Sequence, residues 1–192
     1  DAAVAVRLGA ALAAALCCIA ADAAEIEVLD IDHASQRYRM HLIARLDTPL
    51  QRSFAALRDF DNLPRINDAV ETAQMVDGAA AGAQRLYTRV RVCVWFFCTH
   101  LDQVQDIREH RDAVALGLDA VVLPAQSNLR FGTARWRMRA CGTDQTCLTF
   151  DAELEPDFWV PPILGPWAIE RAMRSEAIDT ARGIERLARS VQ

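Results

Sequence analysis

The side chains that commonly perform catalysis do not form a recognisable set in this sequence. No serine or cysteine is paired with a histidine in a nucleophile motif, no two carboxylates have the spacing of a general acid and base, and no glycine-rich loop would hold phosphate. On predicted strands, His41 and His100 share a face with charged residues, and His33 and His110 fall in predicted turns, so all four are expected at the surface. The sequence therefore predicts no catalytic residue, no cofactor and no metal.

Acid–base chemistry in the interior would require one of four other residues. Tyr87 is expected to point outward, whereas Glu176 and Asp179 lie on a predicted helix. Arg130 is the basic residue that the alternation of residues 130–136 directs inward. There it would bind an anionic headgroup or extend its guanidinium to the rim of the interior.

The first 23 residues have the layout of a secretory signal peptide. A single arginine precedes an apolar run over residues 8–20, and small residues surround the expected cleavage site. An uncleaved membrane anchor is one alternative, although the run is shorter than the ~20 residues that a bilayer requires. A lipoprotein modified at Cys17 or Cys18 is another. We predict that residues 1–23 are removed on export to the periplasm or the exterior, leaving a single domain over residues 24–192.

The four cysteines of the expected mature chain, at positions 93, 98, 141 and 147, predict two disulfides. Four free thiols or a metal site are the alternatives, and the unequal spacing without a set of nearby histidines argues against a metal. A straight strand would hold Cys93 and Cys98 ~16 Å apart, so their pairing requires the chain to reverse at residues 94–97. We therefore predict Cys93–Cys98 and Cys141–Cys147 bridges at the tips of two hairpins.

In the register that follows for each hairpin, most facing pairs join opposite charges. The cysteines and the charged residues fall on the same face of each hairpin, which we take as the outer face of the sheet. The expected facing pairs are Arg85 with Asp106, Arg89 with Asp102 and Arg91 with His100 in the first hairpin, and Arg137 with Asp151 and Arg135 with Glu153 in the second.

The remaining patterns predict a sheet wrapped around a final helix. Residues 25–47 read as extended with a turn near residues 33–36, and residues 48–70 as two short helices. Residues 71–155 read as a meander of six antiparallel strands, and an apolar stripe over residues 166–190 predicts one long helix. The predicted fold class is α+β, with an antiparallel sheet of about seven strands curved around a long C-terminal helix.

The hairpin registers also define which side chains face this helix. Most are apolar, but Thr88, Gln103 and Gln105 interrupt them, and an unpaired buried amide costs roughly 1 to 3 kcal/mol. An interior cavity that holds water or a ligand would satisfy these groups; a place at the rim, or bonds to one another and to the helix, is the alternative. The expected cavity residues are Thr88, Val90, Leu101, Gln103, Gln105, Arg130, Trp136, Met138, Phe150 and Met173.

Four segments together resemble the START-like superfamily, also called SRPBCC or polyketide cyclase/dehydrase and lipid-transport proteins. They are FAALRDFDNLPRINDAVETAQMV (54–76), RVCVWFFC (91–98), FGTARW (131–136) and EPDFWVPPILGPW (155–167), the last being the most specific and similar to a bacterial exported branch. The resemblance covers the chain from Tyr38 to Arg189. It implies a helix-grip fold, with two short helices after the first strand and a hydrophobic cavity between sheet and helix. It implies no particular reaction, because the superfamily includes carriers, receptors, cyclases and quinone-binding chaperones.

Large aromatic residues are expected to gather at one end of the sheet. Successive turns of an antiparallel meander alternate between its two ends, so residues 94–97, 124–128 and 156–166 should share an end. A portal there would admit an apolar ligand from a membrane surface or a partner, and a small core that caps the sheet is the alternative. The expected portal residues are Trp95, Phe96, Phe97, Phe158, Trp159 and Trp167.

The net charge and the composition limit the classes of molecule that the protein is expected to bind. The chain has a net charge of −5 and 52% hydrophobic residues, which argues against binding to nucleic acid and is compatible with one full core. We hypothesise an exported monomeric carrier for a hydrophobic small molecule or lipid, with transient contact to a membrane surface. A cyclase- or dehydratase-type enzyme acting on a hydrophobic substrate, and a protein-docking module with a dry core, are the alternatives.

Overall fold

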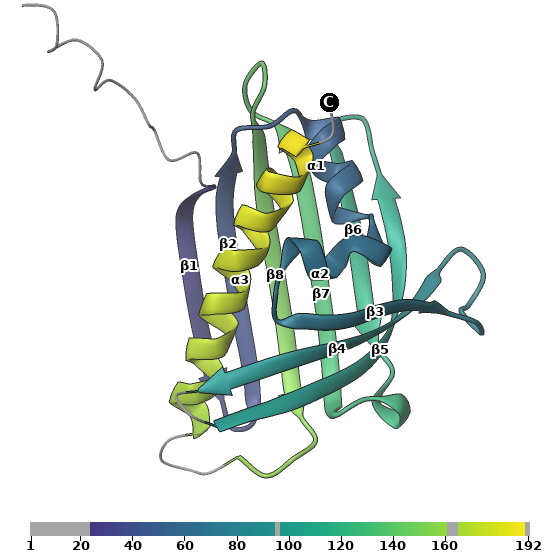
Figure 1. Ribbon diagram of the computed structural model, residues 1–192, viewed down its shortest axis with the longest axis vertical. Coiled ribbons are helices and arrows are strands. Elements are labelled where there is room, and N and C mark those ends of the chain that lie inside the picture. The colour runs from purple at the N-terminus through teal and green to yellow at the C-terminus, as the bar shows by residue number, and fades with distance from the viewer. Residues whose placement is uncertain (1–23, 95–96, 161–164, 191–192) are drawn as a thin grey trace, which may run out of the picture.

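The computed structural model describes residues 24–94, 97–160 and 165–190. The predicted signal segment, residues 1–23, lies outside these ranges. An eight-stranded antiparallel sheet bends around the last helix, with strand order β1-β2-β8-β7-β6-β5-β4-β3 (Figure 1). The strands are β1 (Glu25–Ala34), β2 (Arg37–Leu46), β3 (Val70–Val76), β4 (Gln84–Val94), β5 (Phe97–Arg111), β6 (Ala115–Val122), β7 (Leu129–Ala140) and β8 (Thr146–Pro156).

Within the described ranges, three α-helices cover one face of the sheet. They are α1 (Leu50–Leu57), α2 (Leu63–Ile66) and α3 (Gly165–Ser190), and short 3-10 turns precede α2 at Phe60–Asn62 and follow β6 at Pro124–Gln126. The predicted α+β helix-grip class is confirmed. The sheet has one strand more than the predicted count, because the extended residues before the turn at Ser35 pair with β2 as a separate strand, and the short helices accordingly follow β2.

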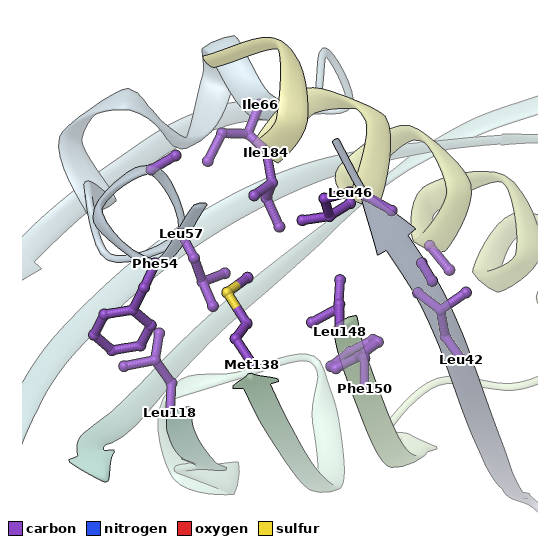
Figure 2. Packing of buried hydrophobic residues seen from close by; sticks show 14 of the residues in the cluster. Leu42, Leu46, Phe54, Leu57, Ile66, Leu118, Met138, Leu148, Phe150 and Ile184 are labelled. Carbon is purple, nitrogen blue, oxygen red and sulfur yellow. The ribbon is translucent and has the colours of Figure 1, made fainter. Parts of the chain in front are cut away.

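The packed core lies between α3, α1 and the central strands. Leu42, Leu46, Met138 and Leu148 project from the sheet toward Ile184 of α3, and all five of these side chains are completely buried (Figure 2). Phe54 and Leu57 of α1 close the same cluster from the side (Figure 2). The second half of the apolar stripe predicted for the last helix is therefore buried by this core.

The first predicted hairpin register is confirmed. Arg85 faces Asp106, Arg89 faces Asp102, Arg91 faces His100 and Cys93 faces Cys98. The Arg85 and Arg89 guanidinium groups donate to their carboxylates at 2.7 and 2.8 Å, and the Cys93–Cys98 disulfide joins the tip of the hairpin. These contacts place the charged side chains on the outer face and leave the alternate residues for the inner face.

The second predicted register is wrong by two residues, although the predicted Cys141–Cys147 disulfide is present. Arg135 faces Asp151 and Arg137 faces Thr149. Cys141 lies past the end of β7, so the bridge crosses the hairpin diagonally, with a Cα–Cα distance of 5.7 Å that a disulfide readily spans. Because side chains alternate with period two, a shift of two residues leaves every side chain on its predicted face.

A glycine lets α3 approach α2 at backbone distance. A Cβ added at Gly183 would lie 1.7 Å from the carbonyl oxygen of Ile66, the last residue of α2. Arg186, one turn further along α3, donates to the carbonyl oxygens of Arg65 and Ile66 at 3.0 and 3.3 Å. The end of the short helix is thus held directly against the long one.

This contact gives a test of the helix arrangement. Alanine is ~1 kcal/mol better than glycine in a helix interior, so Gly183→Ala would stabilise an isolated α3. In the protein the added methyl must displace α2, and we expect the free energy of unfolding to fall by about 1–3 kcal/mol. Urea unfolding would measure this, with Gly142→Ala as the control, because a Cβ there meets only the side chain of Gln145. A stabilised Gly183→Ala protein would contradict the close approach.

Candidate functional site

A cavity of about 680 Å³ lies between the sheet and the first half of α3. Its volume falls in the range of roughly 300–1,000 Å³ that is typical of small-molecule sites. Along each element the lining residues give way to the packed core at the same level. Trp136 of β7 and Met173 of α3 line the cavity, whereas Met138 and Ile184 further along are buried in the core. One half of the interior is therefore hollow and the other half is filled.

Eight of the ten predicted cavity residues line this space, namely Thr88, Val90, Leu101, Gln103, Gln105, Trp136, Phe150 and Met173. Met138 does not, because it lies one inward position beyond Trp136 and is completely buried among core side chains. The Trp136 and Phe150 rings are stacked with centroids 3.7 Å apart, which gives the wall a flat aromatic section.

The prediction that Arg130 points into the cavity is wrong. A bulge in the pairing of β7 with β8 between Leu129 and Phe131 interrupts the alternation, so Leu129 takes the inward position and is 3% exposed. Arg130 is turned to the outside, where its guanidinium donates to Asp157 at 2.9 Å and to Glu155 at 3.4 Å. Alternation alone carries no sign of such a bulge.

The β4–β5 wall carries polar groups that have no partner among the described residues. Thr88 lies directly opposite Gln103, and Leu86 lies opposite Gln105. The Thr88 hydroxyl is buried without a hydrogen-bond partner, and neither glutamine amide bonds to any side chain in the part of the chain that the structure describes. The glutamines therefore do not satisfy each other, and their amides are available to a bound molecule or to water.

A second polar group, formed by Asn67, Glu176 and Thr180, lies where α2 meets α3. Asn67 Nδ2 donates to Glu176 Oε2 at 2.7 Å and to Thr180 Oγ1 at 3.0 Å, and all three residues line the cavity. The N–H of Ala69 donates to Asn67 Oδ1 at 2.9 Å. Because a backbone N–H can only donate, this last bond fixes which end of the amide faces α3.

Burial raises the pKa of Glu176 above the ordinary glutamate value. The nearby charge of Asp179 raises this pKa further, whereas the hydrogen bond from Asn67 opposes the shift. The sequence indicated Glu176 only as one of two acids on the helix, and it gave no indication of Asn67. The role of Asn67 depends on the contact between α2 and α3, which no local pattern encodes.

The remaining ionisable candidates lie outside the cavity or have partners there. Tyr87 donates to Asp102 at 2.6 Å on the outer face, and Asp179 is exposed and accepts from Ser175. His100 and Glu153 border the cavity along their strands, but their side chains form ion pairs with Glu71 at 3.2 Å and Arg37 at 3.4 Å. The histidines at positions 33, 41, 100 and 110 are all partly exposed, as predicted, although His33 and His110 belong to β1 and β5 and not to turns.

The predicted aromatic end is partly described. Trp95 and Phe96 lie outside the described residues, and Phe97 begins β5 beside them. Phe158, Trp159 and Trp167 are 48%, 78% and 44% exposed, and Phe158 also lines the cavity. The end of β8, the start of α3 and the tip of the β4–β5 hairpin lie at the lower end in Figure 1. There the N–H of Asp157 donates to Asn128 O at 2.9 Å, which joins two of the loops that were predicted to share an end.

Two other kinds of site are absent from the described ranges. No helix within them is long and apolar enough to cross a membrane. No group of three or more histidine, cysteine or acidic side chains among the same residues is arranged to hold a metal ion.

Comparison with solved structures identifies the fold. Neither a family model nor a curated protein sequence matches the chain. A START superfamily protein from Mycobacterium smegmatis superposes with a TM-score of 0.64 at 13% identity, over 80% of this chain and 99% of that one. The Zhui aromatase/cyclase from Streptomyces sp. R1128 gives 0.61 at 11%, over 80% and 94%. A STAR-related lipid transfer protein from Xanthomonas axonopodis gives 0.58 at 10%, over 84% and 98%. The chain has the START-like helix-grip fold.

The raised pKa of Glu176 makes a prediction about stability. A folded-state pKa above the unfolded value means that the protonated form is favoured by folding, and this contribution is lost as the pH rises through the folded pKa. Glu176→Gln keeps an acceptor for Asn67 and removes the charge. We therefore expect the variant to be more stable than the parent at pH 7 and the difference to shrink at pH 4, as measured by urea unfolding.

The control for this experiment is Asp179→Asn, which removes an exposed charge from the same helix and should change stability much less. A Glu176→Gln protein that is less stable than the parent at pH 7 would show that the surroundings stabilise the carboxylate charge, and a raised pKa would then be wrong.

Proposed function

We propose that the protein is an exported carrier that binds a hydrophobic small molecule or lipid between the sheet and α3 and does not transform it. The observation that carries this proposal is the cavity of about 680 Å³, lined mainly by apolar side chains, next to a core of buried apolar side chains. Protein interiors are normally close-packed, and an apolar void is destabilising, so a cavity of this size calls for an occupant.

Structural neighbours support the same class of ligand. One is described as a lipid transfer protein and another as an aromatase/cyclase, which also makes an enzyme the second candidate. Glu176 favours that candidate, because it is an acid with a raised pKa on a cavity wall. A cyclase would need a second group to exchange protons with the substrate, and His100 and Glu153 are engaged in ion pairs on the outer face. The cavity itself weighs against a docking module with a dry core.

Two disulfides support the proposed location. Both bridges close hairpins in a small domain, and disulfides persist in oxidising compartments such as the periplasm or the exterior. We propose accordingly that residues 1–23 are removed and that residues 24–192 act as a monomeric periplasmic or secreted domain.

Binding of the apolar fluorophore N-phenyl-1-naphthylamine tests the carrier proposal. Trp136→Ala removes half of the aromatic stack on the wall, and we expect the affinity to fall about three- to tenfold, which corresponds to the ~0.5–1.5 kcal/mol of an aromatic contact. Gln103→Leu removes an unpaired amide and should strengthen binding of this apolar probe. Val121→Ala on the outer face is the matched control and should change nothing, since Val121 is 48% exposed. Unchanged affinity in both cavity variants would place the site elsewhere.

Native mass spectrometry of protein purified from its own compartment separates carrier from enzyme. The carrier proposal expects a co-purified hydrophobic molecule whose mass stays constant on incubation. A mass change that depends on Glu176 would establish the enzyme.

We further propose that the exposed aromatic end admits the ligand and touches membranes. The large rings of Phe158 and Trp159 are exposed, and contact with a lipid or a partner would bury them. Phe158 also lines the cavity, so the exposed aromatic surface is continuous with it. The net charge of −5 offers no attraction to anionic lipid, so contact would rest on these rings.

Liposome binding tests the portal. We expect binding to neutral phosphatidylcholine vesicles with little dependence on salt, and a severalfold slower transfer of the fluorophore to vesicles in Trp159→Ser, with stability unaltered because the ring is 78% exposed. Val114→Ser is the control, because Val114 is 75% exposed in the turn between β5 and β6, at the other end of the sheet. Unchanged transfer in Trp159→Ser would refute the portal.

A further inference from the structure

Two hydrogen bonds to Asn67 fix the Glu176 carboxylate, which presents an acceptor oxygen to the cavity. Asn67 Nδ2 occupies Oε2 at 2.7 Å, and the amide cannot reverse because Ala69 N–H holds its other end. Asn67 is itself positioned by the contact of Ile66 with Gly183. The second carboxylate oxygen, Oε1, bonds to no side chain or N–H among the described residues and is not fully enclosed by protein. It is a fixed hydrogen-bond acceptor that lacks a donor within the described chain.

The described cavity wall offers no arginine or lysine to balance an anion. No arginine is among the described residues that line it, and the chain contains no lysine. Arg130, the residue expected to supply that charge, is turned outward to Asp157 and Glu155. An anionic ligand would therefore lose its hydration, meet no such cation, and lie in the same cavity as the Glu176 carboxylate.

From these two observations we propose that Asn67 and Glu176 form a polar subsite that selects hydrophobic molecules ending in a hydrogen-bond donor, such as a long-chain or terpenoid alcohol, and rejects carboxylates. The inference rests on the proposed carrier function and deepens it by naming the class of ligand. Gln103 and Gln105 on the β4–β5 wall carry both donors and acceptors, so they can form hydrogen bonds with many polar groups. They therefore do not by themselves distinguish an alcohol from an acid.

Three retinoids with the same polyene make a matched set of probes. Retinol ends in a hydroxyl that donates, retinyl acetate has no donor, and retinoic acid is an anion at neutral pH. Quenching of protein fluorescence gives the dissociation constant of each. At pH 7.5 we expect the parent protein to bind retinol at least about tenfold more tightly than retinoic acid, with retinyl acetate between them.

Glu176→Leu removes the acceptor, and we expect it to abolish the preference for retinol over retinyl acetate. Glu176→Gln must give its only oxygen to Asn67 Nδ2 and therefore turns an NH2 donor to the cavity. We expect it to lose the preference for retinol over retinyl acetate and to bind retinoic acid to within about threefold of retinol, because the like-charge repulsion is gone. Asp179→Asn removes an exposed charge from the same helix without touching the cavity and should leave all three affinities as in the parent.

The outcomes separate this inference from the carrier proposal. If the three retinoids bind the parent equally, or if neither Glu176 variant changes their order, the subsite is refuted while the cavity stands as a hydrophobic site. If no retinoid and no naphthylamine binds the folded parent saturably, the carrier proposal falls, and the subsite falls with it.

Discussion

The backbone contact between Gly183 of α3 and Ile66 of α2 determines how the interior of this protein is divided. It holds the short helices against the second half of α3, where Ile184 and its neighbours fill the space above the sheet. The first half of α3 contacts β1 through Glu170 and Arg174 and contacts Asn67 through Glu176, and its inner side lines the cavity. A close contact in one half of the molecule thus coexists with an open space in the other.

This division separates stability from binding. Hydrophobic burial in the packed half, from Phe54, Leu148 and Ile184 among others, supplies the free energy that keeps the sheet and helix together. The hollow half can then keep an unpaired hydroxyl at Thr88 and a buried carboxylate at Glu176, each of which costs stability. Groups that cost stability and face a cavity are typical of a binding site.

The sequence predicted those features that depend on short-range order. Cysteines and complementary charges determined the register of the β4–β5 hairpin, and period-two alternation identified most of the cavity wall. The predicted alternation failed at the bulge between Leu129 and Phe131, where one extra residue reverses it. The predicted register of β7 with β8 failed because Cys141 and Cys147 form a disulfide without facing each other. Sequence reasoning could not foresee the bond between Asn67 and Glu176, because that bond joins residues far apart in the chain through a contact between two helices.

The bulge in β7 also decides which of two neighbouring side chains, Leu129 or Arg130, faces the cavity. With the extra residue, Leu129 takes the inward position and Arg130 lies outside. At this position of the cavity wall, the backbone register therefore determines whether the inward side chain carries a charge. Deletion of Leu129 would bring Arg130 to the inward position opposite Pro156 and would add a cation to a described wall that now has no arginine. The charge inside such a cavity can therefore change through a shift of backbone register as well as through a substitution.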